Sequence, residues 1–453
     1  MREVRLHDTL SGELRRLQPR DGRVGIYACG PTVYAPIHVG NARPFVVFAL
    51  LKRFLEQQGY EVTLVENVTD VNDKIYDAAR EAGVPSEKLA REMTERYERD
   101  TDRLGVGRPD HEPRASETIE PIVDLIQALI EQDHAYAAGG DVYFRVRTFP
   151  GYGKLSNRRL EDMDQGEGDD AAVELKESPQ DFALWKGRKP GEDTSWPAPW
   201  GEGRPGWHIE CSAMAEQILG VEFDVHGGGL DLVFPHHENE IAQTEAARGR
   251  PLARIWMHNG MVEFEEAKMS KSVGNIRSLD GALDEYGRDA LVMYFVGGHY
   301  RSPLSFSPEV LEDARRSVER IRELARRLDR EAGAGGIEPY ADRFWEALAD
   351  DFNTPEALAA LFDWVREANR RIDAGERVGP GALGEMLWTV GLEGLLEPEK
   401  EEVDPEAQRL LEEREAARAE RDFEVADRKR DELARRGWEV RDTPEGPRLV
   451  RTT

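Results

Sequence analysis

Cysteine is scarce in this chain, which has only Cys29 and Cys211 among its 453 residues. Two thiols so far apart in sequence argue against a disulfide framework and agree with a reducing compartment. Long apolar runs are missing too. The longest, Phe45 to Leu51, is too short to cross a bilayer, and the first 17 residues lack the apolar stretch of a secretion signal. We therefore expect a soluble, cytoplasmic protein that has no membrane partner.

An excess of positive charge is also missing, because the formal net charge is −28. Such a charge repels a polyanion at long range, which argues against a protein that coats nucleic acid through bulk charge. A net negative charge is still compatible with a local basic surface that binds nucleic acid. The Arg-rich stretches 315–330 and 366–371 could form one, or could be solvated helix faces balanced by Glu and Asp.

The amino-terminal part predicts a parallel β-sheet. Residues 23–28 (RVGIYA) have the pattern of a buried strand, Gly30 and Pro31 favour a turn, and an apolar helix is expected over 38–58. The next strand begins at Glu61. A strand, a crossover helix and a second strand make a βαβ unit, whose ligand crevice lies at the carboxyl ends of the strands. We predict an α/β fold with a Rossmann-like sheet.

The rest of the chain changes character twice. A polar segment over 150–205, rich in Gly, Pro, Asp and Glu, is typical of an inserted connection. Beyond about residue 307, long amphipathic helices with apolar residues three and four apart indicate a helical bundle. A charged stretch around 398–405 could be a linker to a small final region.

Several possible metal ligands stand in the segment FPHHENEIAQTE. On a helix, His236 and Glu240 are four apart and share a face, and His237 with Glu240 is the weaker alternative. The two thiols are candidates for the remaining positions of a zinc tetrahedron, and Cys211 is expected near the start of a helix, where the dipole favours a thiolate. The alternative is that both cysteines are small buried hydrophobes and HHENE is a polar helix start.

Two short motifs suit ATP. In HVGN (38–41), imidazole or backbone amides at a helix amino terminus can meet phosphate oxygens, and Gly40 permits close approach. In KMSKS (268–272), the compact ammonium groups of Lys268 and Lys271 suit the charge of a departing pyrophosphate. Alternatively, His38 is a capping or packing residue and KMSKS a solvated loop.

These two motifs resemble the signatures of class I aminoacyl-tRNA synthetases. Five longer segments are similar to the cysteinyl members of that family, in the same order: CGPTVYAPIHVGNARPFV, NVTDVNDKIYDAA, GRPGWHIECSAMA, FDVHGGGLDLVFPHHENEIAQTEA and DDFNTPEALAALFDWVREANRR. The resemblance covers nearly the whole chain. The chain departs from the family at Ala35-Pro36, where many relatives have a polar or aromatic pair, and at Asn72, often an Asp. These departures concern the pocket rim.

The resemblance implies a cysteine–tRNA ligase with one zinc ion per chain and Mg²⁺ bound with ATP. Cysteine, ATP and the cognate tRNA would be its partners, and the chain would act as a monomer. Zinc would recognise the substrate thiolate, because it prefers soft sulfur to the hydroxyl of serine. A relative that passes activated cysteine to a small amine, as in the mycothiol pathway, is one alternative, distinguished by the region after Ala341. A non-catalytic zinc-bearing RNA-binding paralogue is the other.

The resemblance also assigns roles to residues. The implied zinc ligands are Cys29, Cys211, His236 and Glu240. The implied catalytic residues are His38, Asn41, Lys268 and Lys271. ATP would further contact Gly40, His226, Gly227 and Gly228, in a turn over 227–229 that lines the adenosine crevice. Cysteine would contact Cys29, Thr69, Trp207 and Asp231. The anticodon would be read by Arg436, Trp438, Asp442 and Arg448, with Trp438 stacking on a base.

The implied domains follow the same likeness. They are the first half of a Rossmann catalytic domain at 1–130, an inserted connective segment at 131–200, the second half of the catalytic domain at 201–265, the KMSKS loop and stem-contact region at 266–315, a tRNA-binding helical bundle at 316–398 and a C-terminal anticodon-binding region at 399–453.

Overall fold

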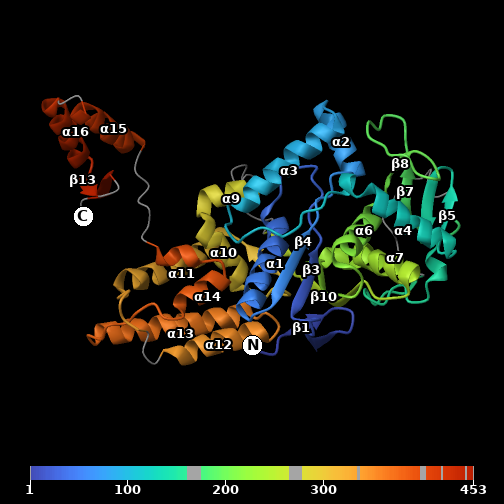
Figure 1. Ribbon diagram of the computed structural model, residues 1–453, viewed down its shortest axis with the longest axis horizontal. Helices are drawn as coiled ribbons and strands as arrows, with labels where there is room; N and C mark the ends of the chain where they lie inside the picture. The colour runs from blue at the N-terminus through green and yellow to red at the C-terminus, as the bar shows by residue number, and fades with distance from the viewer. Residues whose placement is uncertain are drawn as a thin grey trace. The chain divides into compact units, whose positions relative to one another are not determined.

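The computed structural model describes residues 2–160, 175–264, 278–333, 337–397, 405–419, 422–443 and 446–451. It has two compact units, Met1–Leu396 and Glu397–Thr453, each with its own core (Figure 1). No helix in the described ranges is both long enough and apolar enough to span a bilayer.

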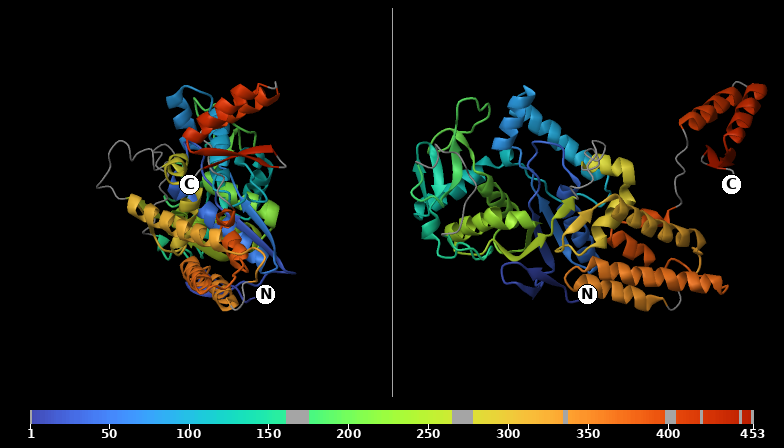
Figure 2. Two further views of the ribbon diagram at one scale, coloured as in Figure 1. Left: turned by 90° about the vertical axis from the view of Figure 1, so that its left-hand side faces the viewer. Right: turned by 180° about the vertical axis from the view of Figure 1, so that it is seen from behind.

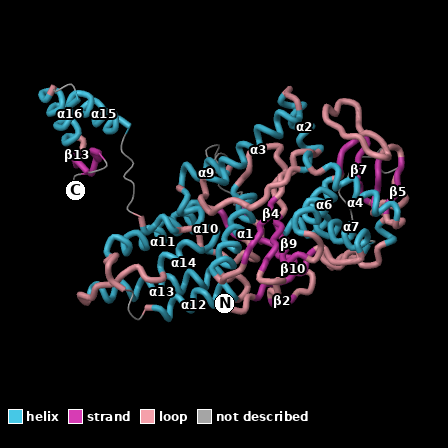
Figure 3. Tube along the Cα trace, viewed as in Figure 1, coloured by secondary structure: helices cyan, strands magenta, loops and turns pink. Residues whose placement is uncertain are grey.

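The first unit is built around a parallel four-stranded sheet in the order β10-β9-β3-β4 (Figures 1 and 3). Its strands are β3 (Arg23–Ala28), β4 (Glu61–Glu66), β9 (Phe223–Gly229) and β10 (Ala253–Asn259). The predicted strands at 23–28 and from Glu61 are confirmed, and so is their parallel pairing. The strand order reverses between β3 and β9, and this is the position at which open α/β sheets form ligand crevices.

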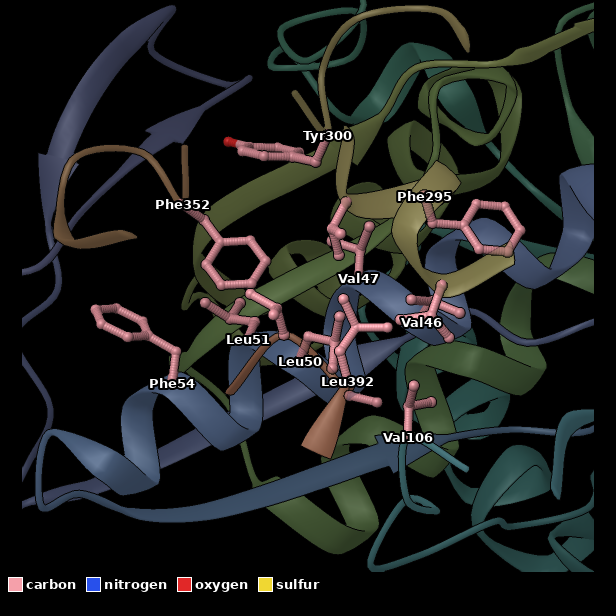
Figure 4. Packing of buried hydrophobic residues seen from close by; sticks show 14 of the residues in the cluster. Val46, Val47, Leu50, Leu51, Phe54, Val106, Phe295, Tyr300, Phe352 and Leu392 are labelled. Carbon is pink, nitrogen blue, oxygen red and sulfur yellow. The ribbon is translucent and has the colours of Figure 1, made fainter. Parts of the chain in front are cut away.

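Helix α1 (Val39–Gln57) connects β3 to β4 and packs on the sheet, as predicted for 38–58. Most of its residues are apolar and buried, because the sheet packs against it on one side and the helical part of the unit on the other. Figure 4 shows Val47, Leu51 and Phe54 of α1 facing Tyr300 and Phe352, which come from the helical part of the unit. Fully burying side chains of this size contributes roughly 1.5–3 kcal/mol each. The packing therefore joins the sheet and the bundle into one core.

The inserted segment forms a second sheet rather than a simple connection. It is antiparallel, in the order β5-β6-β7-β8, with the bounds β5 (Ala135–Ala138), β6 (Asp141–Phe144), β7 (Phe182–Gly187) and β8 (Gly203–Pro205). Three helices complete its core: α4 (Ile119–Glu131), α6 (Trp207–Leu219) and α7 (Glu238–Arg248). Because α6 and α7 also border the parallel sheet, they connect the two layers.

The helical part begins at Leu279, earlier than predicted. Its helices are α9 (Leu279–Tyr286), α10 (Arg288–Gly297), α11 (Pro308–Arg327), α12 (Glu338–Ala349), α13 (Thr354–Asp373), α14 (Leu383–Thr389) and the short η7 (Glu393–Leu396). The boundary predicted at 316 falls inside α11, which Ser307 caps by accepting a bond from the Val310 amide. Figure 2 shows the parallel sheet between this bundle and the inserted sheet.

Short elements fill the remainder of the first unit. They are β1 (Arg5–Asp8), β2 (Glu13–Arg16), α2 (Asp73–Ala82), α3 (Ser86–Asp102), η1 (Ala115–Glu117), η2 (Val146–Thr148), η4 (Leu230–Leu232), η5 (Val233–His237), β11 (Val262–Phe264) and β12 (Leu304–Phe306). The second unit consists of α15 (Pro405–Ala419), α16 (Phe423–Arg435) and the antiparallel pair β13 (Trp438–Thr443) and β14 (Gly446–Arg451).

Candidate metal and substrate site

Two cysteines, a histidine and a glutamate meet where the strand order reverses. Cys29 directly follows β3, and its amide donates to the Gly227 carbonyl of β9 at 2.9 Å. Cys211 comes from α6, His236 from η5 and Glu240 from α7. One donor atom from each of these four side chains lies within 4.8 Å of the others. The fold therefore brings together the four residues that the sequence predicted as zinc ligands.

The pair four residues apart is in contact as helical spacing predicted. His236 Nε2 lies 3.1 Å from Glu240 Oε1. The geometry is less regular than a continuous helix, because His236 lies in η5, which contains a non-helical Phe234, and α7 proper begins at Glu238. Both side chains are buried.

The helix position predicted for Cys211 was wrong. Helix α6 begins at Trp207, so Cys211 lies in its second turn, away from the free amides of the amino terminus. A different cause produces the expected thiolate: a hydrogen bond from Cys29 lowers the pKa of Cys211 to about 6, assisted by His236 and opposed by burial and by Glu240. Burial, followed by Cys211, raises the pKa of Cys29 well above its usual value. The two opposite shifts favour the proton on Cys29 and the ionised form of Cys211.

Further histidines surround this cluster. His208 Nδ1 lies 3.0 Å from His236 Nδ1, and His237 Nε2 lies 3.3 Å from the sulfur of Cys29. His237 also contacts His258, with 2.7 Å between ring nitrogens, while His226 Nε2 lies 2.7 Å from Glu240 Oε2. Burial lowers the pKa values of His208, His237 and His258, so these three rings are neutral at pH 7.

A second possible ligand set shares two members with the first. Cys29, His226, His237 and Glu240 also bring donor atoms within 4.8 Å of one another. This set includes His237, the weaker alternative from the sequence, and leaves out Cys211. The sequence reasoning missed His208, although His208 precedes Cys211 by three residues and so shares its helix face. His258 lies on β10, and no motif identified it.

The residues expected to contact the amino acid border the cluster. Trp207 stacks on His236, with 4.4 Å between ring centroids and 26° between planes. Thr69 is buried, accepts a bond from Asn67 and donates to Glu210 Oε2 at 3.3 Å. Asp231 lies exposed in η4, beyond the end of β9. These positions surround the site from three different elements.

Glu210 is a site residue that sequence reasoning missed. It is fully buried, and burial, followed by the neighbouring Cys211, raises its pKa well above the usual value. Its Oε1 has no hydrogen-bond partner in the described part of the chain. The buried carboxyl group of Glu210 has a spare oxygen beside Thr69. This oxygen can accept a hydrogen bond from a bound molecule.

His38 and Asn41 form a reciprocal cap at the start of α1. The Asn41 amide donates to His38 Nδ1 at 3.2 Å, and the His38 amide donates to Asn41 Oδ1 at 3.1 Å. A Cβ at Gly40 would lie 2.9 Å from the His38 ring, so any other residue there would displace the capping ring. His38 also neighbours Phe264 and Ser278. Lys268 and Lys271, predicted for ATP, lie outside the described residues.

The predicted turn at 227–229 is instead the end of strand β9. His226 is fully buried, its Nε2 contacts Glu240 and its ring stacks on Trp256, so its contact with ATP stays a prediction. Gly227 and Gly228 are small for packing reasons, because a Cβ on Gly227 would lie 2.0 Å from Phe48 and one on Gly228 would lie 2.8 Å from Leu232.

The tRNA residues predicted in the second unit have different surroundings. Arg436 is exposed and lies 3.6 Å from Glu406. Trp438 is only 2% exposed, in a core with Leu410, Leu433 and Leu449. This burial leaves little of the Trp438 side chain exposed to a base, and its predicted stacking stays a prediction. The side chains of Asp442 and Arg448 are outside the described part of the structure.

Comparison with known families accounts for nearly all of the chain. Residues 16–316 match the model of the tRNA synthetases class I (C) catalytic domain, 343–391 match the DALR domain, and 400–447 match the cysteinyl-tRNA ligase anticodon binding domain. The chain is 45% identical to the cysteine–tRNA ligase of Symbiobacterium thermophilum over 99% of both chains. It is 46% identical to that of Halorhodospira halophila over 99% of this chain and all of the relative.

A solved structure supports the fold. Mycobacterium tuberculosis methionyl-tRNA synthetase bound by methionyl-adenylate matches with a TM-score of 0.60 at 16% identity, over 83% of this chain and 89% of the other.

Proposed function

The chain belongs to the cysteine–tRNA ligase family of class I aminoacyl-tRNA synthetases, and from this we propose that it activates L-cysteine with ATP and transfers the cysteinyl group to the 3′ end of its cognate tRNA. The observation that carries the proposal is the convergence of Cys29, Cys211, His236 and Glu240 at the switch point of the sheet. In the first step, the cysteine carboxylate attacks the α-phosphate of ATP and pyrophosphate leaves. In the second, a terminal ribose hydroxyl of the tRNA attacks the cysteinyl-adenylate.

We propose that one zinc ion per chain is held by Cys29, Cys211, His236 and Glu240. Two sulfurs, an imidazole nitrogen and a carboxylate oxygen are a donor set that zinc accepts, and the low pKa of Cys211 favours the ligating thiolate. When bound, zinc would supply a soft Lewis acid for the substrate sulfur, which the hydroxyl of serine matches poorly. This set is preferred to the one with His226 and His237 because it uses both thiols.

The side chains around the cluster would hold the rest of the amino acid. Trp207, stacked on His236, would cover the side chain of cysteine and exclude water from it. Thr69 and Glu210 present a hydroxyl and a spare carboxyl oxygen near the cluster, and Asp231 is exposed in η4. These groups suit the ammonium and carboxylate of an α-amino acid. They would orient the carboxylate toward ATP, which is the main contribution that positioning makes to such a reaction.

ATP would lie across the start of α1. We propose that His38 and Asn41 exchange their capping bonds for phosphate contacts, with Gly40 allowing close approach and Mg²⁺ accompanying the nucleotide. Gly227 and Gly228 would contribute only their backbone. Lys268 and Lys271 are proposed to neutralise charge on the departing pyrophosphate. The described residues that precede and follow this part of the chain, Phe264 and Ser278, both neighbour His38, which supports the proposal.

For the tRNA, we propose that the bundle and the C-terminal unit, 399–453, bind the body and the anticodon. The match of 400–447 to an anticodon binding domain supports this over a ligase that acts on a small amine. Arg436 remains a candidate contact because it is exposed, and Asp442 and Arg448 are retained as proposals. We further propose that the protein acts as a monomer in the cytoplasm, and its two free, buried thiols are consistent with that reducing compartment.

The test is charging of a tRNA transcript with cysteine and with serine, before and after chelation of the purified protein. Cysteine-specific charging that is lost on chelation and restored by zinc is the expected result. Cysteine-dependent exchange of pyrophosphate into ATP must also occur, since a non-catalytic paralogue would show none. Exchange without charging of any tRNA would point to the ligase that uses a small amine.

A further inference from the structure

Arg43 is a buried cation that none of the roles above explains. It lies on α1, five residues after His38, and it is 1% exposed. Burial lowers its pKa to about 10, so the guanidinium remains charged at neutral pH. Burying a charge costs several kcal/mol unless it is paired. The described part of the chain supplies no carboxylate partner for Arg43, so the charge must be retained for another reason.

The partners of Arg43 are backbone carbonyl groups from two separate segments. Nη1 donates to the Gly260 carbonyl at 2.5 Å and, more weakly, to that of Met261 at 3.4 Å. Nη2 donates to the His299 carbonyl at 2.9 Å. The segments are themselves joined, because the Gly260 amide donates to the Tyr300 carbonyl at 2.8 Å. One planar side chain thus binds both segments to the first helix of the sheet.

The Gly260–Met261 turn is closely packed around this contact. A Cβ on Gly260 would lie 2.4 Å from the Ser302 carbonyl oxygen. The Leu304 amide also donates to the Met261 carbonyl at 2.9 Å, where β11 pairs with β12. The turn therefore cannot shift without disturbing the 299–304 segment. Its position relative to α1 depends on the bonds from Arg43.

These contacts join the two parts of the chain that carry the ATP motifs. The turn of α1 that holds Arg43 follows the His38–Asn41 cap directly. Met261 leads at once into β11, which ends at Phe264, immediately before the residues that contain Lys268 and Lys271. The ring of Phe264 lies 6.1 Å from that of His38. Arg43 thus bonds the helix that begins in one motif to the turn that leads into β11, the strand that precedes the other motif in the sequence.

We propose that Arg43 is a positioning residue for the ATP-dependent step, which holds the HVGN end of α1 at a set distance from β11 so that both motifs meet the same phosphates. The proposal rests on the proposed function. It favours a guanidinium over other large side chains, because its two terminal nitrogens stand in a fixed planar fork and each donates to a different segment. Arg43 itself touches no reacting atom.

The experiment compares Arg43→Met with Arg53→Met in the full-length, zinc-loaded protein. Arg53 is a matched control on the same helix. It is partly buried, donates to the carbonyl groups of Trp388 and Gly105 and also pairs with Glu393 at 3.0 Å, and it lies at the opposite end of α1 from the cap. Cysteine-dependent pyrophosphate exchange gives kcat and the KM values for ATP and cysteine, and thermal unfolding gives Tm.

Arg43→Met should lower kcat of exchange by about 100-fold, the effect expected of misplaced reacting groups, with the KM for cysteine unchanged. Arg53→Met should lower Tm by a similar amount and leave kcat near that of the parent. Arg43→Lys should recover part of the loss, since an ammonium group can still donate to one segment. This variant also serves if Arg43→Met does not fold.

Equal loss of kcat in the Arg43 and Arg53 variants would overturn the proposal, because both effects would then follow from stability alone. Full exchange activity in Arg43→Met or Arg43→Lys would overturn it as well. Failure of the proposed function looks different, since in that case the parent protein itself shows no cysteine-dependent exchange.

Discussion

The imidazole Nε2 of His226 lies 2.7 Å from Oε2 of Glu240, and both side chains are fully buried. This contact uses one carboxylate oxygen of Glu240, while Oε1 faces His236 and Cys29. The ring of His226 is held in turn by stacking on Trp256, with 4.4 Å between centroids. His226 therefore orients a proposed metal ligand without being needed as one.

Replacement of His226 by Phe should weaken zinc binding. Phe keeps the stacking surface for Trp256 but leaves Oε2 of Glu240 without its partner, and loss of such a supporting contact typically lowers metal affinity by about 10- to 100-fold. Competition with a chromophoric chelator measures the affinity. The matched control is His134→Phe, because His134 stacks on Phe144 in the inserted domain instead. Unchanged affinity in His226→Phe would contradict the role.

Replacement of Glu238 by Ala should destabilise the fold strongly. The buried carboxylate of Glu238 accepts bonds from the backbone amides of Gly153, Leu155 and Ser156, at 2.9, 3.1 and 2.8 Å. Ala leaves three buried donors unpaired, at about 1–3 kcal/mol each. Urea unfolding should give Glu238→Ala a much lower free energy of unfolding than Glu238→Gln, because the Gln side chain retains one acceptor oxygen.

The control for Glu238 is on the same helix. Glu245 pairs with Lys154 near the surface, so Glu245→Gln should cost at most about 1 kcal/mol. A cost for Glu238→Ala no larger than this would show that the segment 153–156 relaxes and satisfies its amides in another way.

Glu66 should make stability depend on pH. Burial raises its pKa from 4.5 to about 8, although Tyr97 donates a hydrogen bond to it at 2.6 Å. Between these pH values, the folded protein retains a proton that the unfolded chain has released, so the free energy of unfolding falls as pH rises through the window. Glu66→Gln does not titrate, and its stability relative to the parent should rise with pH by up to about 1.4 kcal/mol per unit.

Denaturant unfolding of the two proteins at intervals between pH 5 and pH 9 checks this prediction. Other titrating groups are common to both proteins and cancel in the difference. The difference should level off above pH 8, where Glu66 is ionised in both states. A constant difference across the whole range would mean that the carboxyl of Glu66 titrates normally in the folded protein.

Removal of the second unit should separate the two steps of the reaction. The unit from Met1 to Leu396 has its own core and contains Cys29, Cys211, His236 and Glu240. A chain that ends at Leu396 should therefore retain cysteine-dependent pyrophosphate exchange at close to the full rate. Its charging of tRNA should fall by at least tenfold in kcat/KM, because the proposed anticodon contacts are lost. Full charging activity in the truncated chain would show that the C-terminal unit is not needed to recognise the tRNA.

Local patterns in the sequence determined much of this protein. The buried strand at 23–28, the apolar helix that follows and the strand from Glu61 could be predicted because hydrophobic period and turn residues act over a few neighbours. The spacing of His236 and Glu240 indicated a shared ligand site for the same reason. The comparison of motifs then extended these local signals to the family and its zinc ligands.

Tertiary structure alone decided the surroundings of those residues. His226 stands in a strand whose alternation turns it toward Glu240, and the start of α6 at Trp207 moves Cys211 away from the helix end. Burial of Trp438, the inserted sheet and the carbonyl partners of Arg43 are likewise contacts between segments far apart in sequence. Local propensity carries no information on such contacts, because their free energy depends on which segments the folded chain packs together.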